Sequence, residues 1–320
     1  MLIDRFGRKI DYLRVSITDR CNFRCLYCYS IKKWKKLKHE DILRFEEILK
    51  VVKVGSELGI RRVRITGGEP LLRKNVEYFI KELKKISGIE DIGLTTNGYF
   101  LLEKAEALRE AGLLRINISL DTLKKEKFER LTGVDGWERV WKGIQKALKL
   151  GFSPVKINAV IVRGFNDDEV VDLAKLTLDY PVEVRFIEFM PIGENSFWNE
   201  ENVFLASEIK KRLEEVFPLE PAEKVGGGPA RVFKWGRGIG KIGIISPISE
   251  SFCEKCNRLR LTADGRLRPC LFSDFEINLK AIIRGEAKGS IEDAFFQAVE
   301  KKPERLELHP TERFMRAIGG

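Results

Sequence analysis

The sequence predicts an α/β protein: a partial (β/α)6 barrel of the TIM type, followed by a smaller C-terminal α+β domain. Two observations predict the barrel. Short apolar segments alternate with amphipathic segments over the first two-thirds of the chain, and polar residues or glycines follow the apolar segments. A third observation, a cluster of glycine and proline after Pro218, predicts the second domain. We place the boundary near residue 222, which gives domains of residues 1–222 and 223–320.

Six apolar segments are predicted as the barrel strands, and right-handed crossovers between them would make the strands parallel. Their number falls short of the eight units that a complete barrel needs, so a partial barrel is expected. The six segments are Tyr12–Thr18, Arg62–Thr66, Asp91–Thr95, Arg115–Leu120, Val155–Val162 and Glu183–Phe189.

Five segments between these strands carry apolar residues at helical spacing and are predicted as helices. They are Asp41–Leu58, Asn75–Ile86, Leu101–Ala111, Trp137–Leu150 and Asp168–Leu178. Asn166 followed three residues later by Glu169 predicts a capping box at the start of the last helix. In the C-terminal domain, a glycine-rich turn between Ala230–Trp235 and Lys241–Ser246 predicts a β-hairpin.

Composition excludes several classes of protein. The chain has no apolar signal region at its N-terminus and no uncharged apolar run of membrane length, so we expect a cytoplasmic protein without a membrane span. Six cysteines without a secretory signal favour metal or cluster ligation over disulfides. The net charge of +10 suits an anionic ligand, although interleaved Lys and Glu on predicted helices also fit an ordinary solvated surface.

Three cysteines directly follow the first predicted strand. Cys21, Cys25 and Cys28 have the spacing C-x3-C-x2-C. Three thiolates can bind a zinc ion or an iron–sulfur cluster, but structural zinc sites usually add a second pair of ligands further on. Three thiolates on a four-iron cubane leave one iron open for a small molecule. The spacing therefore favours a cubane, with zinc as the alternative.

Polar residues or glycines also follow, or lie within, the other predicted strands. In a barrel of parallel strands these positions converge at the carboxyl-terminal edge, where ligands bind. They are Gly67-Gly68-Glu69, Thr95-Thr96-Asn97-Gly98, Ser119, Lys156 with Asn158, and Met190. Most of these residues have an ordinary structural explanation, but a lysine inside a barrel needs an anionic partner.

A second set of three cysteines lies in the C-terminal domain. Cys253, Cys256 and Cys270 have the spacing C-x2-C-x13-C, and His309 could complete a Cys3His zinc site. Arg258 and Arg260 alternate on one face of a probable strand between these cysteines. Two guanidinium groups aimed together suit a polyphosphate, which favours a nucleotide-binding site with a cluster.

These motifs resemble those of the radical S-adenosylmethionine (SAM) superfamily. Over essentially the whole chain they are similar to the family of lyases that opens molybdenum cofactor biosynthesis by cyclising GTP. The matching stretches are Arg14–Tyr29, Arg64–Pro70, Thr95–Gly98, Ser119–Asp121, Phe189–Gly193, Phe252–Asp264 and Arg268–Leu271, with the C-terminal double glycine. Tyr29-Ser30 departs from the Met-Pro of many members, which puts no ligand in doubt.

The resemblance implies two [4Fe–4S] clusters and SAM as cofactors, and it assigns roles by position. The catalytic cluster would be held by Cys21, Cys25 and Cys28. The second cluster, whose open iron faces guanine, would be held by Cys253, Cys256 and Cys270. SAM would be surrounded by Tyr27, Gly68, Ser119 and Met190. GTP would be bound by Arg14, Arg64, Thr95, Lys156, Arg258 and Arg260, with Thr96 as an alternative to Thr95. The tail Gly319-Gly320 would enter the active site and be needed for the reaction.

The resemblance also implies partners. A flavodoxin- or ferredoxin-like donor would supply electrons, and the next pathway enzyme, cyclic pyranopterin monophosphate synthase, would receive the product. Nucleic acid is not expected. Two alternatives stay open: a peptide-modifying radical SAM enzyme, which would carry more than three cysteines in its C-terminal half, and a basic, zinc-holding nucleic-acid-binding protein, which predicts a contiguous Lys/Arg surface with exposed aromatic residues.

Overall fold

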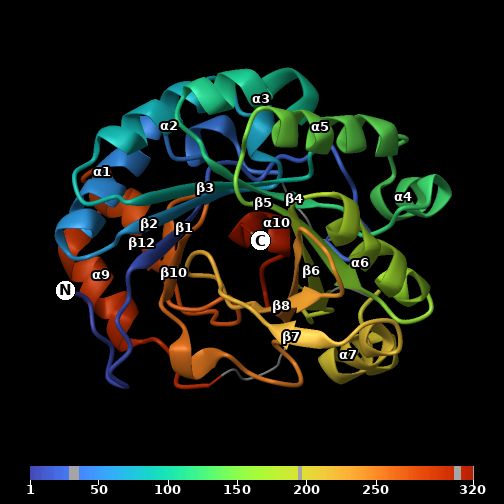
Figure 1. The fold of residues 1–320 in the computed structure, drawn as a ribbon. Coiled ribbons are helices and arrows are strands. Elements are labelled where there is room, and N and C mark those ends of the chain that lie inside the picture. The colour runs from blue at the N-terminus through green and yellow to red at the C-terminus, as the bar shows by residue number, and fades with distance from the viewer. Residues whose placement is uncertain (29–35, 194–196, 306–310, 320) are drawn as a thin grey trace.

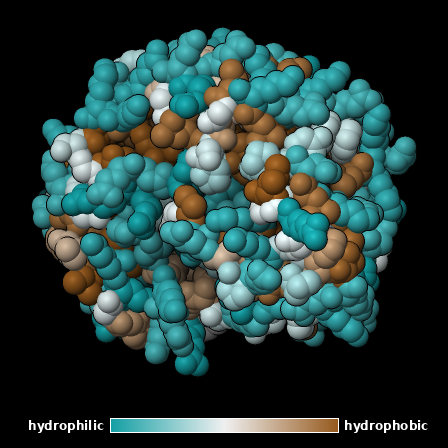
Figure 2. All heavy atoms as spheres, viewed as in Figure 1, coloured by the Kyte–Doolittle hydropathy of each residue, from teal (hydrophilic) through white to brown (hydrophobic). Residues whose placement is uncertain are grey.

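The computed structural model describes residues 1–28, 36–193, 197–305 and 311–319. In this part of the chain the strands form one twelve-stranded sheet that curves around the C-terminal segment, with the longer helices on its outside (Figure 1). The strand order is β12-β11-β10-β1-β2-β3-β4-β5-β6-β9-β8-β7. Hydrophilic side chains cover most of the face seen in the same view (Figure 2). None of the helices described is long and apolar enough to span a bilayer.

The six predicted barrel strands are confirmed, with ends that differ by at most two residues. They pair in parallel from β1 to β6. Their bounds are β1 (Tyr12–Ser16), β2 (Arg62–Thr66), β3 (Asp91–Thr96), β4 (Arg115–Ser119), β5 (Val155–Ile161) and β6 (Val182–Glu188). The α/β barrel fold predicted from the sequence is therefore present.

The five predicted helices are also confirmed. They are α1 (Phe45–Glu57), α2 (Val76–Lys85), α3 (Leu101–Glu110), α5 (Trp137–Lys149) and α6 (Val170–Asp179). The short helix α4 (Lys125–Thr132) was not predicted, because charged residues dominate it and it buries little beyond Phe128 and Leu131. The remaining helices are α7 (Ala206–Glu214), α8 (Leu279–Ile283), α9 (Ile291–Glu300) and α10 (Met315–Ile318).

The predicted capping box before α6 is wrong. Asn166 Oδ1 accepts a hydrogen bond from the Val162 amide (2.8 Å), and the Glu169 carboxylate accepts from the Thr122 hydroxyl and the Leu123 amide (each 2.8 Å). Both side chains thus bind neighbouring strand ends, and a short 3-10 turn precedes the helix. Tertiary hydrogen bonds here replace the local pair that the spacing suggested.

Strands from the C-terminal third extend the barrel sheet at both edges. At one edge β10 (Arg258–Leu261) pairs in parallel with β1, followed by β11 (Arg266–Arg268) and β12 (Ile277–Asn278). At the other edge β9 (Lys241–Ile245) pairs with β6, followed by β8 (Arg231–Trp235) and β7 (Leu219–Pro221). The predicted hairpin is β8–β9. Because both parts of the chain share one sheet, the boundary near residue 222 stays a prediction.

The two faces of the barrel strands differ in chemistry. One set of alternating residues, including Leu13, Val15 and Ile65, is fully buried in the apolar core beneath the helices. The other set faces the barrel interior and is largely polar. In neighbouring strands Arg14 stands opposite Arg64 and Arg260. A (β/α) barrel usually fills its interior with bulky apolar side chains, so a polar interior indicates a ligand site.

Candidate active site

Both cysteine sets line one cavity of about 320 Å³ inside the barrel. We call Cys21, Cys25 and Cys28 the first trio, and Cys253, Cys256 and Cys270 the second trio. All six are free thiols. The first trio lies in the loop after β1, and the second flanks β10 and β11. Because β10 pairs with β1, the fold brings together two motifs that lie more than two hundred residues apart in the sequence.

The first trio lies in surroundings that disfavour thiolates. Burial raises the pKa of all three cysteines, and for Cys28 it does so to about 11. The carboxylate of Glu69 adds to this effect at Cys21, and that of Asp121 adds to it at Cys25. The backbone amide of Phe23 donates to Cys21 Sγ (3.4 Å). These thiols would ionise only with help from a bound metal centre.

Gly67 and Gly68 hold the backbone of the cysteine loop. The Gly68 amide donates to the Thr18 carbonyl and the Glu69 amide to the Arg20 carbonyl, each at 2.7 Å. A Cβ atom at Gly68 would lie 2.4 Å from the Arg20 carbonyl oxygen. The close approach expected of these glycines is therefore made to the protein's own backbone, and both residues also line the cavity.

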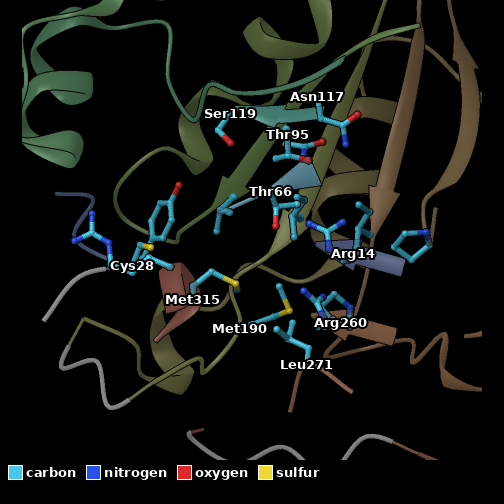
Figure 3. A pocket seen from close by; sticks show the side chains of 18 of the residues that line it. Arg14, Cys28, Thr66, Thr95, Asn117, Ser119, Met190, Arg260, Leu271 and Met315 are labelled. Atoms are coloured by element: carbon cyan, nitrogen blue, oxygen red, sulfur yellow. The ribbon is translucent and has the colours of Figure 1, made fainter. Parts of the chain in front are cut away.

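The hydroxyl groups of two neighbouring threonines at the end of β3 differ in their hydrogen bonds. The Thr96 hydroxyl donates to Glu69 Oε1 (2.7 Å) and accepts from the Gly98 amide (3.0 Å). The Thr95 hydroxyl is buried at the cavity, where Figure 3 shows it, and no hydrogen-bond partner for its oxygen exists among the described residues. Thr95, and not Thr96, therefore has a hydroxyl available for a ligand.

The residues predicted to surround SAM all line the cavity: Tyr27, Gly68, Ser119 and Met190. The Tyr27 hydroxyl donates to Asp121 Oδ2 (2.7 Å), and Asp121 Oδ1 accepts from the Val160 amide (2.8 Å). Burial raises the pKa of Asp121 to about 6, although both hydrogen bonds act against this shift. Asp121 thus fixes the Tyr27 ring beside the first trio.

The second trio lies among cations. Arg258 Nη2 and Lys302 Nζ lie 3.6 and 3.5 Å from Cys256 Sγ. Burial alone would raise the pKa of Cys256, but these two cations more than offset burial and lower its pKa to about 6. Arg14 and Arg260 also face the cavity, and burial lowers the pKa of Arg14 to about 10. Figure 3 shows these two arginines on neighbouring strands.

The C-terminal tail lies in the middle of the barrel, where Figure 1 shows α10. Arg260 Nη1 donates to the carbonyl of Gly319 (2.9 Å). Gly319 has φ +83°, and a Cβ atom there would lie 2.5 Å from Thr66 Oγ1, so only glycine fits. Gly320 lies outside the described residues.

Two residues predicted to bind GTP, Arg64 and Lys156, do not line the cavity that the described residues form. Arg64 donates to the Tyr12 hydroxyl (3.1 Å) and to Asn117 Oδ1 (3.3 Å). Lys156 forms an ion pair with Glu183 on the next strand (3.2 Å), which is the anionic partner expected of a buried lysine. Both side chains are buried, and their assignment to GTP stays a prediction.

Several cavity residues were not predicted as site residues. They are Asn117, Arg185, Lys302 and Arg316. The alternation of side chains along β4 and β6 could have identified the first two, because each lies two residues from a polar residue on the same face of its strand. Lys302 and Arg316 follow no strand, and no local pattern marks them.

The residues fit the cofactors that the motifs implied. Among the described residues, no group of three Cys, His, Asp or Glu side chains is placed to hold a single metal ion. His309, the ligand required by the zinc alternative, lies outside the described residues. Thr95 Oγ1 and Asn158 Oδ1 are buried at the cavity without a hydrogen-bond partner in the described structure, as expected of a site built for a polar ligand.

Comparisons with known proteins agree with this site. The model of the radical SAM superfamily matches residues 15–177, and the model called Molybdenum Cofactor Synthesis C matches residues 182–308. The barrel and its first trio therefore belong to a radical SAM protein, a class whose cofactors are a [4Fe–4S] cluster and SAM. The alternative of a zinc-holding nucleic-acid-binding protein is thereby set aside.

Curated relatives show to which family within the radical SAM class the chain belongs. The GTP 3′,8-cyclase of Moorella thermoacetica is 49% identical over 99% of this chain and 99% of its own length. That of Pelotomaculum thermopropionicum is 46% identical with the same coverage of both chains. The chain belongs to the GTP 3′,8-cyclase family.

Solved structures share the fold. SuiB of Streptococcus suis bound to S-adenosylmethionine aligns with a TM-score of 0.64 over 90% of this chain and 68% of its own, at 13% identity. The structure of anSMEcpe with bound AdoMet aligns with a TM-score of 0.58 over 92% and 81%, at 16% identity. At such identities the likeness concerns the fold alone.

Proposed function

We propose that this chain is a GTP 3′,8-cyclase, which converts GTP into (8S)-3′,8-cyclo-7,8-dihydroguanosine 5′-triphosphate in the first step of molybdenum cofactor biosynthesis. One observation carries the proposal most directly. Two cysteine trios line a single cavity, and the second trio lies beside a cluster of buried and half-buried arginines. This arrangement would place SAM beside the first trio and a nucleoside triphosphate beside the second.

SAM is assigned to the side of the first trio. A [4Fe–4S] cluster held by Cys21, Cys25 and Cys28 would supply the electron for reductive cleavage of SAM there. Asp121 orients Tyr27 beside the trio, while Met190 and Ser119 line the same side. These residues hold the adenosyl group in place and keep water away from a reactive radical.

GTP is assigned to the side of the second trio. Arg14, Arg258 and Arg260 face the cavity from β1 and β10, and Arg185 adds a fourth guanidinium from β6. Arg185 already forms an ion pair with the Glu183 carboxylate (2.6 Å), so a triphosphate would chiefly balance the charges of the other arginines. The unpaired Thr95 hydroxyl offers a further hydrogen bond. Arg64 and Lys156 lie deeper and would complete the positive field around the phosphates.

The tail is assigned to the same reaction. Gly319 is held by Arg260 and packs against Thr66, so it brings the C-terminus into the barrel. A tail in this position, with Gly320 beyond it, would shield the nucleotide from water and keep Arg260 oriented. Because only glycine fits at Gly319, any side chain there would displace the tail.

The proposal includes two partners and a compartment. Reductive cleavage of SAM needs an electron from outside the chain, for which a flavodoxin- or ferredoxin-like protein is the proposed donor. The product passes to the next pathway enzyme, cyclic pyranopterin monophosphate synthase. We place the reaction in the cytoplasm, where GTP and reducing equivalents are available.

Anaerobic turnover tests the proposal. The reconstituted protein, supplied with GTP, SAM and a chemical reductant, should form 5′-deoxyadenosine and a cyclised nucleotide that mass spectrometry finds at the mass of GTP. Omitting GTP should sharply reduce 5′-deoxyadenosine formation. SAM cleavage that does not depend on GTP, with no cyclised nucleotide, would contradict the proposed function.

A further inference from the structure

A lysine is buried beneath the second trio. Lys302 follows α9 and is only 2% exposed. Its ammonium group donates to three acceptors: Cys256 Sγ (3.5 Å), the Arg258 carbonyl (2.8 Å) and the Pro269 carbonyl (2.9 Å). All three of its hydrogens are therefore used at the cysteine site.

The charges around Lys302 indicate which anionic groups balance its ammonium group. Its anionic neighbours are the sulfurs of Cys256 and Cys270, while Arg258 and Arg8 are cations nearby. No ion pair between Lys302 and a carboxylate occurs among the described residues. A buried ammonium without a carboxylate is costly unless another anion balances it. Among the described residues, the sulfurs of Cys256 and Cys270, with whatever they bind, are the groups that could supply that anion.

The contacts of Lys302 also connect two separate cysteine segments. The Arg258 carbonyl lies two residues after Cys256, and Pro269 directly precedes Cys270. One ammonium group therefore fixes the backbone near both cysteines. These segments flank the antiparallel pair β10–β11, so this bridge adds a further link next to the cysteines and helps to fix the distance between two ligand sulfurs.

A second cation reaches the remaining cysteine. Arg8 donates to the Cys253 carbonyl (2.7 Å) and to the Pro303 carbonyl (2.7 Å), while its Nε binds Asp4 Oδ2 (2.5 Å). Pro303 is the residue after Lys302. Arg8 thus ties Cys253 to the segment that presents Lys302, and all three members of the second trio are held by two buried cations.

We propose that Lys302, supported by Arg8, is a positioning residue for the second trio: it fixes Cys256 and Cys270 at the spacing of a cluster and raises the reduction potential of that cluster. Hydrogen bonds to ligand sulfurs and a nearby positive charge both stabilise the reduced, more negative state. The inference rests on the second cluster of the proposed function.

Three variants of the full-length, reconstituted protein test it. Lys302→Met keeps the length of the side chain but removes its charge and donors, Lys302→Arg keeps the charge, and Lys301→Met alters the exposed neighbouring lysine as a control. For each, iron is counted, each cluster is titrated anaerobically by EPR, and the release of iron to a chelator is timed.

We expect Lys302→Met to retain the first cluster but to show a lower reduction potential of the second cluster and roughly tenfold faster iron release from it. Lys302→Arg should restore most of both properties, and Lys301→Met should match the wild type. A second cluster in Lys302→Met with wild-type potential, EPR spectrum and iron release overturns the inference.

Two further outcomes are informative. If Lys302→Met fails to fold, Lys302→Gln is compared with Lys302→Arg, because glutamine keeps donors without the charge. A lower potential in Lys302→Gln supports the inference, and equal potentials overturn it. A wild-type protein that holds only one cluster overturns both the proposed function and this inference, whereas an unaffected second cluster in the variants overturns the inference alone.

Discussion

Each side of the cavity carries three cysteines, but the charged groups around the two trios have opposite effects on the cysteines. At the first trio, burial raises the pKa values of all three cysteines, nearby carboxylates add to this at Cys21 and Cys25, and Arg316 is the cation that acts against the shift. At the second trio, Arg258 and Lys302 lower the pKa of Cys256 to about 6. Three cysteines alone therefore do not define what a site binds.

The difference teaches which small molecule belongs to which trio. SAM carries a positive sulfonium, and the carboxylates of Glu69 and Asp121 lie near the first trio. GTP carries negative phosphates, and Arg14, Arg258 and Arg260 lie on the side of the second. With SAM and GTP placed as proposed, charge complementarity would separate the two ligands within one cavity.

The largest expected effect comes from removing one trio at a time. Replacing Cys21, Cys25 and Cys28 by alanine should abolish both SAM cleavage and product formation, while leaving about four irons per chain. Replacing Cys253, Cys256 and Cys270 should also abolish the product and leave about four irons, but SAM binding should persist. Equal loss of SAM binding in both variants would contradict the assignment of SAM to the first trio.

A large but partial effect is expected at Arg260, which faces the cavity and holds Gly319. Arg260→Met removes a buried cation, so the affinity for GTP should fall about 10²- to 10³-fold with little change in SAM affinity. Equilibrium binding of both ligands measures this. Arg237→Met, at an exposed arginine, serves as the control and should leave both affinities unchanged.

The pH dependence of alkylation should distinguish the trios in the metal-free protein. Cys256, with a pKa of about 6, becomes a thiolate as the pH rises through 6, whereas Cys28, with a pKa of about 11, stays protonated until well above neutrality. Allowing for the weaker nucleophilicity of a low-pKa thiolate, iodoacetamide at pH 7 should modify Cys256 about 10²-fold faster. Mass spectrometry of peptides measures both rates, and equal rates would refute the electrostatic contrast.

The smallest expected effect is the difference in GTP affinity and stability between variants of Thr95 and Thr96. Thr95→Val should weaken GTP binding about fivefold, the value of roughly one hydrogen bond, without changing the melting temperature. Thr96→Val removes a donor from the buried Glu69, so it should reduce the free energy of unfolding by about 1–3 kcal/mol and leave GTP affinity unchanged. The reverse pattern in calorimetry and binding would show that Thr96 is the ligand residue.

Much of the fold follows from the sequence because local patterns determine it. The alternation of apolar and amphipathic segments located β1 to β6. The rule that ligands bind at the carboxyl-terminal ends of barrel strands identified Ser119 and the first trio. The pairing of β10 with β1 joins residues far apart in the sequence, and no local pattern encodes it. The position of the second trio across the same cavity could therefore not be derived from periodicity.

Other features depended on partners that only the fold supplies. Lys302 looks like an ordinary surface lysine in a charged segment, yet its ammonium group is buried at Cys256. Gly68 was expected to approach a ligand, and it also packs against the carbonyl of Arg20, a contact that the sequence does not reveal. In both cases the residue type was visible in the sequence, but its partner was not.

The response of each cluster to each ligand tests the central claim most directly. With the second trio replaced by alanine, the EPR spectrum of the reduced remaining cluster should change on adding SAM and not on adding GTP. With the first trio replaced, it should change on adding GTP and not on adding SAM. A reversed response, or two clusters that respond alike, would contradict the assignment of the two sides of the cavity.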